Sequence, residues 1–307
     1  MYKTAVLLST YNGERYLKEQ LDSILTQSGV ELTLYVRDDG SSDRTAAIIE
    51  EYRNNYSCIV FSKGENLGVG NSFMQLVYDV PHEYDYYAFS DQDDIWLENK
   101  LIKAIEMIRD TEGPVLYTSN QLLVDDRGNE LELRHSSAPD TSYMQILCSN
   151  RLSGCTMMWN SSLQKILSDE KRRPSRQMLV NRIHDVWVAM TASVTGRIVF
   201  DSNAYILYRQ HENNVVGVKK TKLLKEWKKK LMSSELRNGR RCLAEAIVKC
   251  DADLINSEEA AARLKRYASC NDSLRTRMEV MKDAKFISGY SGEPARQLAA
   301  KILLGLF

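Results

Sequence analysis

Tyr86-Tyr87-Ala88-Phe89-Ser90-Asp91-Gln92-Asp93-Asp94 is the stretch of sequence on which the fold prediction rests. Its first four residues are aromatic or apolar and predict a buried strand. Three carboxylates follow, and they repel one another strongly unless a cation neutralises them. Carboxylate oxygens suit Mg²⁺ or Mn²⁺, which such sites share with the phosphates of a substrate. The segment predicts a divalent-cation site at a strand end; the alternative interpretation is a solvated acidic turn.

The chain on either side of this segment alternates between predicted strands and predicted helices. Short apolar runs predict strands at residues 4–8, 32–36, 59–61, 86–89 and 115–117. Amphipathic spacing and capping residues predict helices at residues 14–27, 44–54, 71–78 and 97–109. This alternation predicts an α/β fold, in which helices flank an open, mostly parallel central sheet.

Two further polar clusters follow predicted strands, and ligands of such sheets bind at the carboxyl ends of the strands. Asp38-Asp39-Gly40-Ser41-Ser42-Asp43 can place a carboxylate against a nucleobase N–H or a ribose hydroxyl; the alternative is a turn with a helix N-cap. Ser9-Thr10-Tyr11-Asn12-Gly13 offers hydroxyl groups and a helix N-terminus to a phosphate, and the Tyr11 ring can stack on a base. We expect the three clusters to meet at one edge of the sheet.

The pattern loosens after residue 120, where strands are predicted at 156–159, 198–200 and 205–208 and a helix at 181–194. Asp185 lies in the first turn of that helix, where its carboxylate suits a general base, although the helix dipole favours an acid there in any case. The segment Tyr208-Arg209-Gln210-His211-Glu212-Asn213-Asn214 is rich in donors. Its His211 is either a ligand or a structural histidine.

Composition places the chain among ordinary globular proteins. It has 307 residues and a mass of 35.1 kDa, with 43% hydrophobic and 27% charged residues, which excludes a disordered or collagen-like chain. No apolar run approaches the ~20 residues of a membrane span, and the N-terminus does not resemble a signal peptide. Six scattered cysteines without a C-x-x-C pair predict reduced thiols in a cytoplasmic protein.

The net charge of zero hides two regions of opposite charge. Residues 1–218 carry 21 basic and 30 acidic residues, whereas residues 219–307 carry 20 basic and 11 acidic ones. The second region is predicted to be helical, at 221–232, 235–250, 256–269, 273–285 and 295–306. Residues 219–230 interleave basic residues with Leu and Trp, which suits an anionic membrane surface; a packing or homodimer role is the alternative. Nucleic-acid binding is not expected, because no nucleic-acid motif is present.

Taken in chain order, the three clusters resemble the family 2 glycosyltransferases of the GT-A fold, with Asp91-Gln92-Asp93 as the D-x-D element. Four further segments resemble a narrower group, the bacterial rhamnosyltransferases that build cell-wall and capsular polysaccharides. They are Phe89-Ser90-Asp91-Gln92-Asp93-Asp94-Ile95-Trp96, Ser153-Gly154-Cys155-Thr156-Met157, His184-Asp185-Val186-Trp187 and residues 208–214. The resemblance covers residues 1–218.

The resemblance implies an inverting, metal-dependent glycosyltransferase with a catalytic GT-A domain at 1–218 and a basic helical region at 219–307. The donor it implies is a nucleotide-sugar, with dTDP-L-rhamnose favoured over UDP-sugars. The acceptor is a saccharide or a lipid-linked saccharide, so the enzyme is cytoplasmic or peripheral on the inner face of the cell membrane. The Q-x-x-R-W element is absent, which argues against a processive synthase.

The resemblance also assigns roles to residues. Asp185 matches the catalytic base, although His184 stands before it where many members have Glu. Asp93, Asp91 and His211 match the ligands of a Mg²⁺ or Mn²⁺ ion. The residues implied to contact the nucleotide-sugar are Thr10, Tyr11, Asn12, Asp39, Asp91, Gly154, Arg209 and His211.

Other functions remain open from the residues alone. A UDP-hexose-dependent enzyme of the same fold would carry the same clusters. A nucleotidyltransferase would need a Gly-rich basic loop near the N-terminus, and residues 9–13 contain no Lys or Arg. A non-catalytic nucleotide-sugar-binding protein would tolerate the loss of the acidic residues. All of these residues are present, which argues against this alternative. The motifs G-x-G-x-x-G and G-x-x-x-x-G-K-[ST] are absent, which argues against a Rossmann dehydrogenase and against a P-loop NTPase.

Overall fold

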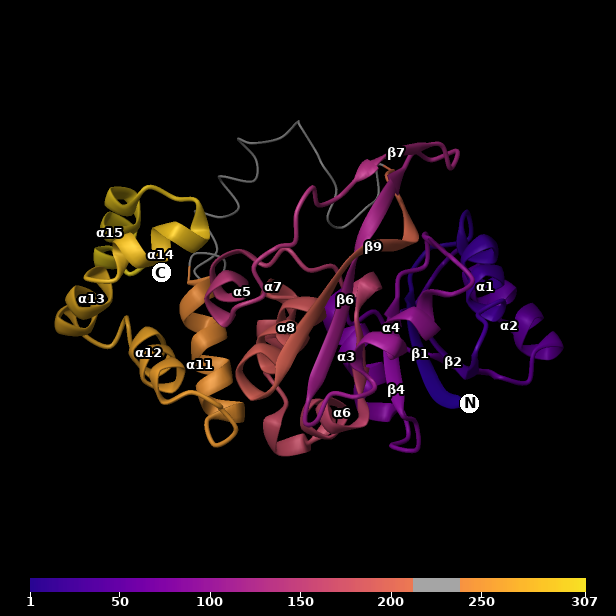
Figure 1. Ribbon diagram of the computed structural model, residues 1–307, viewed down its shortest axis with the longest axis horizontal. Helices are drawn as coiled ribbons and strands as arrows, with labels where there is room; N and C mark the ends of the chain where they lie inside the picture. Colours follow the sequence, from indigo (N-terminus) through magenta and orange to yellow (C-terminus); the bar gives the residue numbers. More distant parts are fainter. Residues whose placement is uncertain (212–237) are drawn as a thin grey trace. The chain divides into compact units, whose positions relative to one another are not determined.

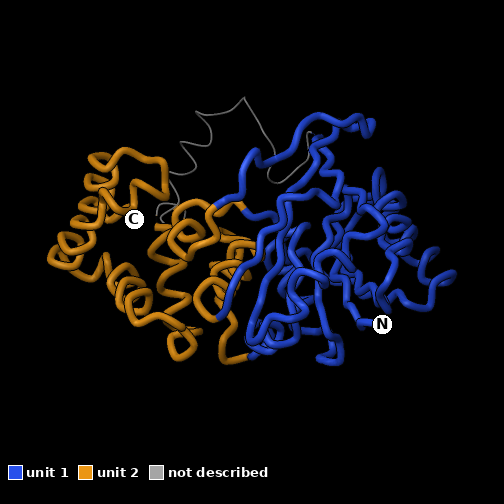
Figure 2. The backbone as a smooth tube through the Cα atoms, viewed as in Figure 1, with its two compact units in different colours: residues 1–139, 152–169, 196–217 blue, residues 140–151, 170–195, 218–307 orange. Residues whose placement is uncertain are grey.

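The computed structural model describes residues 1–211 and 238–307 (Figure 1). The chain forms two compact units (Figure 2). The first comprises Met1–Pro139, Leu152–Asp169 and Gly196–Gly217, and the second comprises Asp140–Arg151, Glu170–Thr195 and Val218–Phe307. The sequence predicted a catalytic domain at 1–218 and a basic helical region at 219–307. That division is by function, so it stays a prediction. The basic segment 219–230 and the predicted helix 221–232 lie outside the described residues.

The first unit is built on a sheet whose strand order is β3-β2-β1-β4-β8-β6-β9-β5, with β7 paired to β6. Its first four strands are parallel: β1 (Tyr2–Thr10), β2 (Val30–Asp38), β3 (Ile59–Lys63) and β4 (Tyr86–Ser90). Their intervening helices are α1 (Leu17–Leu25), α2 (Thr45–Asn55), α3 (Val69–Asp79) and α4 (Lys100–Ile108), the last following β4. These elements confirm the predicted alternation of strands and helices. The prediction succeeds because the spacing of apolar residues is a local signal of which side chains an element buries.

The rest of the sheet is mixed rather than mostly parallel. β8 (Met158–Asn160) runs antiparallel to β4 and to β6 (Val115–Val124), and β5 (Ile95–Trp96) runs antiparallel to β9 (Arg197–Arg209). The edge strand β7 (Glu130–Leu133) is antiparallel to β6. Residues 140–151, between β6 and β8, belong to the second unit. The connection from β6 to β8 is therefore not a compact right-handed crossover, which is the kind of connection that makes two strands parallel.

One long strand, β9, replaces the two short strands predicted at 198–200 and 205–208. It pairs in parallel with β6, and the register shifts between Ser119 and Asn120, which pair with Asp201 and Ala204. The extra residues of β9 form a polar bulge that interrupts the apolar pattern without ending the strand. The short helices η1 (Gly154–Thr156) and α6 (Ser161–Ser168) complete the first unit.

The described elements of the second unit are helical. They are α5 (Tyr143–Ser149), η2 (Glu170–Arg172), α7 (Arg176–Asn181), α8 (His184–Thr195), α11 (Gly239–Asp251), α12 (Glu258–Ala268), α13 (Leu274–Met281), α14 (Ala284–Ser291) and α15 (Ala295–Leu303). The helix predicted at 273–285 is divided, because α13 ends at Met281 and α14 begins at Ala284. Within residues 1–211 and 238–307, no helix has the length and apolarity that crossing a membrane requires.

Candidate functional site

The strand register brings the three predicted clusters to one edge of the sheet. Thr10 at the end of β1 is paired with Asp38 at the end of β2, and Leu8 is paired with Ser90 at the end of β4. The segments that follow are therefore neighbours: the first loop (residues 11–14), the second loop (residues 38–43) and the acidic loop (residues 91–94). This convergence agrees with the rule that ligands of α/β sheets bind beyond the carboxyl ends of the strands.

The first loop is held by side chains rather than by secondary structure. Each of its backbone N–H groups donates to a side-chain oxygen: Tyr11 to Gln92 Oε1 (2.9 Å), Asn12 to Ser41 Oγ (2.9 Å), Gly13 to Thr45 Oγ1 (2.8 Å) and Glu14 to Asp43 Oδ2 (3.1 Å). The Asn12 side chain accepts from Ser42 N at 2.9 Å, and Thr10 is buried. These N–H groups are therefore engaged within the protein, and a phosphate at this loop would meet side chains.

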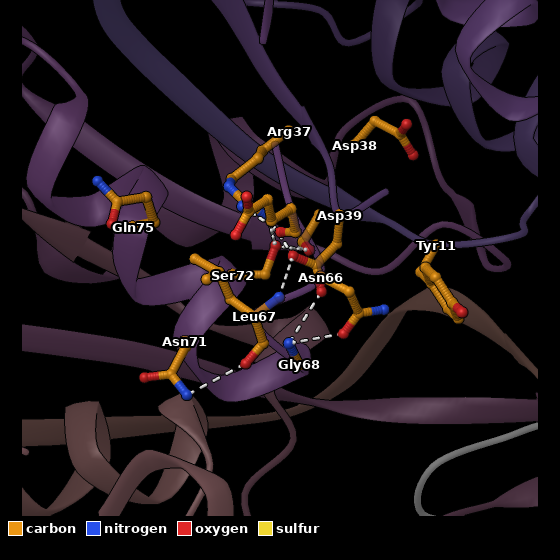
Figure 3. Close-up of polar contacts among 12 residues, drawn as sticks. Tyr11, Arg37, Asp38, Asp39, Asn66, Leu67, Gly68, Asn71, Ser72 and Gln75 are labelled. Atoms are coloured by element: carbon orange, nitrogen blue, oxygen red, sulfur yellow. Dashed lines mark hydrogen bonds and ion pairs between the residues drawn. The ribbon is translucent and has the colours of Figure 1, made fainter. Parts of the chain in front are cut away.

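The second loop contains two buried carboxylates, Asp38 and Asp39, and both accept hydrogen bonds. Figure 3 shows the cluster around Asp39. Asp39 accepts from the backbone N–H groups of Leu67 (2.9 Å) and Gly68 (3.0 Å) and is ion-paired with Arg37. Asp38 accepts from the hydroxyl of Ser41. Asp39 thus holds the N-terminal end of α3 against β2, and its predicted contact with a nucleotide stays a prediction.

The acidic loop lies over a buried group of ionisable side chains. Asp94 is buried, and burial together with Asp93 and Asp91 raises its pKa well above the usual range. Burial also raises the pKa of the Cys155 thiol, and burial lowers the pKa of Lys100 to about 8. The Lys100 ammonium lies 3.7 Å from the centre of the Trp96 ring. Asp94 belongs to the acidic cluster predicted from the sequence, but its burial was not predicted; Lys100 was not predicted as a site residue, because a buried lysine has no local sequence signature.

A cation could bind to ligands that differ in part from the predicted set. Single ligand atoms of Asp91, Asp94 and Cys155 lie within 4.8 Å of one another. The predicted ligands Asp93 and His211 are also adjacent, with Nε2 of the histidine 2.8 Å from Asp93 Oδ2. A thiol whose pKa is raised is a poor ligand, whereas the carboxylates fit Mg²⁺ or Mn²⁺. The chemistry of the donor atoms therefore fits a divalent cation held by the acidic loop.

Arg209 binds the acidic loop from the end of β9. Its backbone N–H donates to Asp94 Oδ1 (3.2 Å), and Nε donates to the carbonyl oxygen of Asp93 (3.2 Å). Nη1 donates to the carbonyl oxygen of Asp126 (3.1 Å), and Nη2 forms an ion pair with Glu19 (2.5 Å). The side chain is 4% exposed, so its guanidinium is largely engaged within the protein. Its predicted contact with the nucleotide-sugar stays a prediction.

Two predicted residues lie farther along the chain. Gly154 is buried in η1, next to Cys155, and its place beside a donor sugar stays a prediction. Asp185 lies in the first turn of α8, in the second unit, and its Oδ1 accepts from the N–H of Val186 (2.6 Å). The preceding residue, His184, is buried, and burial lowers its pKa to about 3. The role of Asp185 as a base stays a prediction.

Comparison with known proteins identifies the family. Residues 5–167 match the family Glycosyl transferase family 2, a range that contains all three loops. The chain belongs to glycosyl transferase family 2. Within this family, it is 31% identical over 224 residues to the dTDP-rhamnosyl transferase RfbG of Shigella flexneri, which covers 68% of this chain and 73% of the relative. A glycosyltransferase of Rickettsia typhi is 25% identical over 218 residues, which are 68% of this chain and 64% of that protein.

Solved structures agree with the family assignment at the level of fold. Staphylococcus aureus TarS (residues 1–349), crystallised with UDP-GlcNAc, superposes with a TM-score of 0.62 at 19% identity and covers 99% of this chain and 93% of its own. At this identity, the likeness shows the fold alone. It confirms the predicted α/β architecture with its helical C-terminal region.

The residues that sequence reasoning missed in this glycosyltransferase are those that support the loops. Arg37 and Gln92 hold Asp39 and Tyr11, respectively, and Glu19 pairs with Arg209. Gln92 stands between the two acids of the D-x-D element, where only its position hints at a role. Arg37 lies in β2 and Glu19 lies in α1, and neither residue belongs to a recognisable motif.

Proposed function

We propose that this chain is an inverting, metal-dependent glycosyltransferase that transfers one sugar from a nucleotide-sugar to a saccharide acceptor in bacterial surface polysaccharide synthesis. The favoured donor is dTDP-L-rhamnose. The observation that carries the proposal is the meeting of three polar loops at one edge of the sheet in a family 2 chain. The similarity to a dTDP-rhamnosyl transferase at 31% identity supports the choice of donor.

The acidic loop is the part of the site that would hold the cation. Asp91 and Asp93, with His211 beside Asp93, supply carboxylate oxygens and an imidazole nitrogen. A divalent cation bound there supplies Lewis-acid stabilisation of the charge that develops on the leaving diphosphate. Tyr11, which is half exposed, stacks on the base, and Asp39 lies on the base or ribose side of the donor.

In the transfer step, Asp185 takes the proton of an acceptor hydroxyl. The hydroxyl oxygen forms a bond to the anomeric carbon from the face opposite the diphosphate. The bond from that carbon to the diphosphate oxygen breaks, and the electron pair leaves with the diphosphate. General-base assistance of this kind contributes roughly 10²–10⁴-fold to the rate.

Ligand-dependent melting tests the donor assignment. A ligand bound to the native state raises Tm by mass action, so dTDP, UDP and GDP are compared with Mn²⁺, Mg²⁺ or EDTA. We expect a metal-dependent shift with dTDP. A shift with UDP alone would retain the glycosyltransferase and point to a UDP-hexose donor. No shift with any nucleotide in folded protein would refute the nucleotide-sugar site.

Two variants test the assigned roles. Asp185→Asn should lower turnover by a factor of about 10²–10⁴ while donor binding stays unchanged, because the amide cannot accept the proton. Asp93→Ala should abolish the metal-dependent Tm shift and most transfer activity. Full turnover of either variant would contradict its assignment. Donor hydrolysis or transfer by the wild-type chain also distinguishes the enzyme from a non-catalytic nucleotide-sugar-binding protein.

A further inference from the structure

Gln92 joins the acidic loop to the first loop by two hydrogen bonds to one residue. Its Oε1 accepts from the backbone N–H of Tyr11 at 2.9 Å, and its Nε2 donates to the backbone carbonyl oxygen of Tyr11 at 3.1 Å. The side-chain amide thus satisfies both polar backbone groups of a residue 81 positions away in the sequence. A paired contact of this kind fixes orientation as well as position, because neither bond can rotate independently of the other.

The space for this amide depends on Gly13. A Cβ atom at position 13 would lie 2.2 Å from Gln92 Oε1 and 2.5 Å from its Cδ, closer than atoms approach. Between Tyr11 and Gly13, Asn12 has a φ of +47°, in the left-handed region that side-chain-bearing residues seldom adopt. The backbone of the first loop is therefore held in place by contacts from other segments.

The Tyr11 side chain contrasts with its backbone. The residue is 49% exposed, and its ring stands apart from the bonded cluster around Asp39 (Figure 3). An aromatic ring that is accessible while its backbone is held at both polar groups needs little further ordering to stack on a ligand. Stacking of a base on an aromatic ring contributes substantially to the binding of a nucleotide, so the position of this ring matters for affinity.

We propose that Gln92 is a positioning residue for the donor: it fixes the Tyr11 backbone so that the ring meets the nucleotide base. Gln92 lies between the two acids that the proposed function assigns to the cation. The same side chain therefore ties the base-binding loop to the cation-binding loop. This inference rests on the proposed function, because it names a base as the group that Tyr11 contacts.

Four variants of the 307-residue chain test it: Gln92→Ala, Gln92→Glu, Gly13→Ala and the double variant Gly13→Ala/Gln92→Ala. Gln92→Ala releases the Tyr11 backbone, and ordering one residue costs roughly 1–2 kcal/mol, which predicts about 5- to 30-fold weaker dTDP or UDP binding. The donor KM should rise by the same factor, with kcat little changed. Gln92→Glu keeps an acceptor for the Tyr11 N–H but sets a second carboxylate oxygen against the Tyr11 carbonyl oxygen, and these two acceptors repel each other, so nucleotide binding should weaken in this variant as well.

Gly13→Ala provides the sharper test. Its methyl group displaces the Gln92 amide, so this substitution should weaken nucleotide binding about as much as Gln92→Ala does. In the Gln92→Ala background, the methyl group meets no amide, and the second substitution should add little. Gln297→Ala, which removes an exposed glutamine of α15, is the matched control and should leave binding unchanged.

Three readouts separate positioning from general damage: nucleotide affinity by calorimetry, Mn²⁺ affinity by electron paramagnetic resonance, and hydrogen exchange of the Tyr11 amide. We expect weaker nucleotide binding, unchanged Mn²⁺ binding and faster Tyr11 exchange in Gln92→Ala. Nucleotide binding equal to wild type in that variant, or additive effects in the double variant, would overturn the inference alone. Absence of nucleotide binding by the wild-type chain would refute the proposed function and this inference with it.

Discussion

The buried ion pair between Arg37 and Asp39 allows a quantitative prediction for Arg37→Met. The two side chains are only 7% and 4% exposed. Nη1 of Arg37 also donates to Ser72 Oγ (2.8 Å), and Nη2 donates to the carbonyl oxygen of Glu65 (2.9 Å). Methionine retains much of the side-chain volume but removes the charge and all three hydrogen bonds. Asp39 is then a buried carboxylate that keeps only two backbone N–H donors, those of Leu67 and Gly68.

Removing one partner of a buried pair costs about 3–5 kcal/mol. Because the two N–H groups still stabilise the Asp39 carboxylate, we expect the lower end, about 3 kcal/mol of unfolding free energy. A domain of 150–250 residues loses roughly 2–4 °C of Tm per kcal/mol, so Tm should fall by about 6–12 °C.

Urea unfolding followed by circular dichroism, together with scanning calorimetry, measures both quantities. The matched control is Lys103→Met, which removes an exposed pair with Glu106 (2.8 Å; side chains 42% and 46% exposed) and should leave stability close to that of the wild type, because solvent screens this pair. The double variant Arg37→Met/Asp39→Asn should recover part of the loss, because no unpaired buried charge remains. An Arg37→Met protein as stable as the Lys103→Met protein would refute this account of the second loop.

Three further predictions concern stability. Burial lowers the pKa of His184 to about 3, so below pH 6.5 the unfolded chain gains a proton that the folded chain does not, and stability is lost as pH falls from 6.5 towards 3. That loss should reach about 2 kcal/mol at pH 5 in urea unfolding and be absent from His184→Gln, which has no group to titrate there. Gly196→Ala places a Cβ 2.0 Å from the carbonyl oxygen of Pro114 and should cost about 1–3 kcal/mol or more, since backbone must move; wild-type Tm would contradict this. Gly289→Ala, in α14 with open space around the new methyl group, should instead raise stability by about 0.5–1 kcal/mol, and a lower Tm would count against it.

The fold was predictable where its determinants are local. Apolar runs predicted β1, β2 and β4. The polar loops after these strands were also predictable, because an apolar run ends where the chain leaves the sheet. The antiparallel β8 was not predictable, because the residues before it belong to another unit and no local pattern sets its direction. The continuous β9 was also missed, because its bulge resembles a break in the sequence.

The candidate site divides in the same way. The sequence by itself determined which residue types stand at the sheet edge: the three acids of the acidic loop, the acids of the second loop and the Tyr11 segment. Only the tertiary structure decided the partners of each side chain. Asp39 is bonded to residues 28 and 29 positions away, and Gln92 to one 81 positions away. A hydrogen bond acts over about 3 Å, so its partner depends on which chain segments folding brings together, and neither composition nor spacing encodes that.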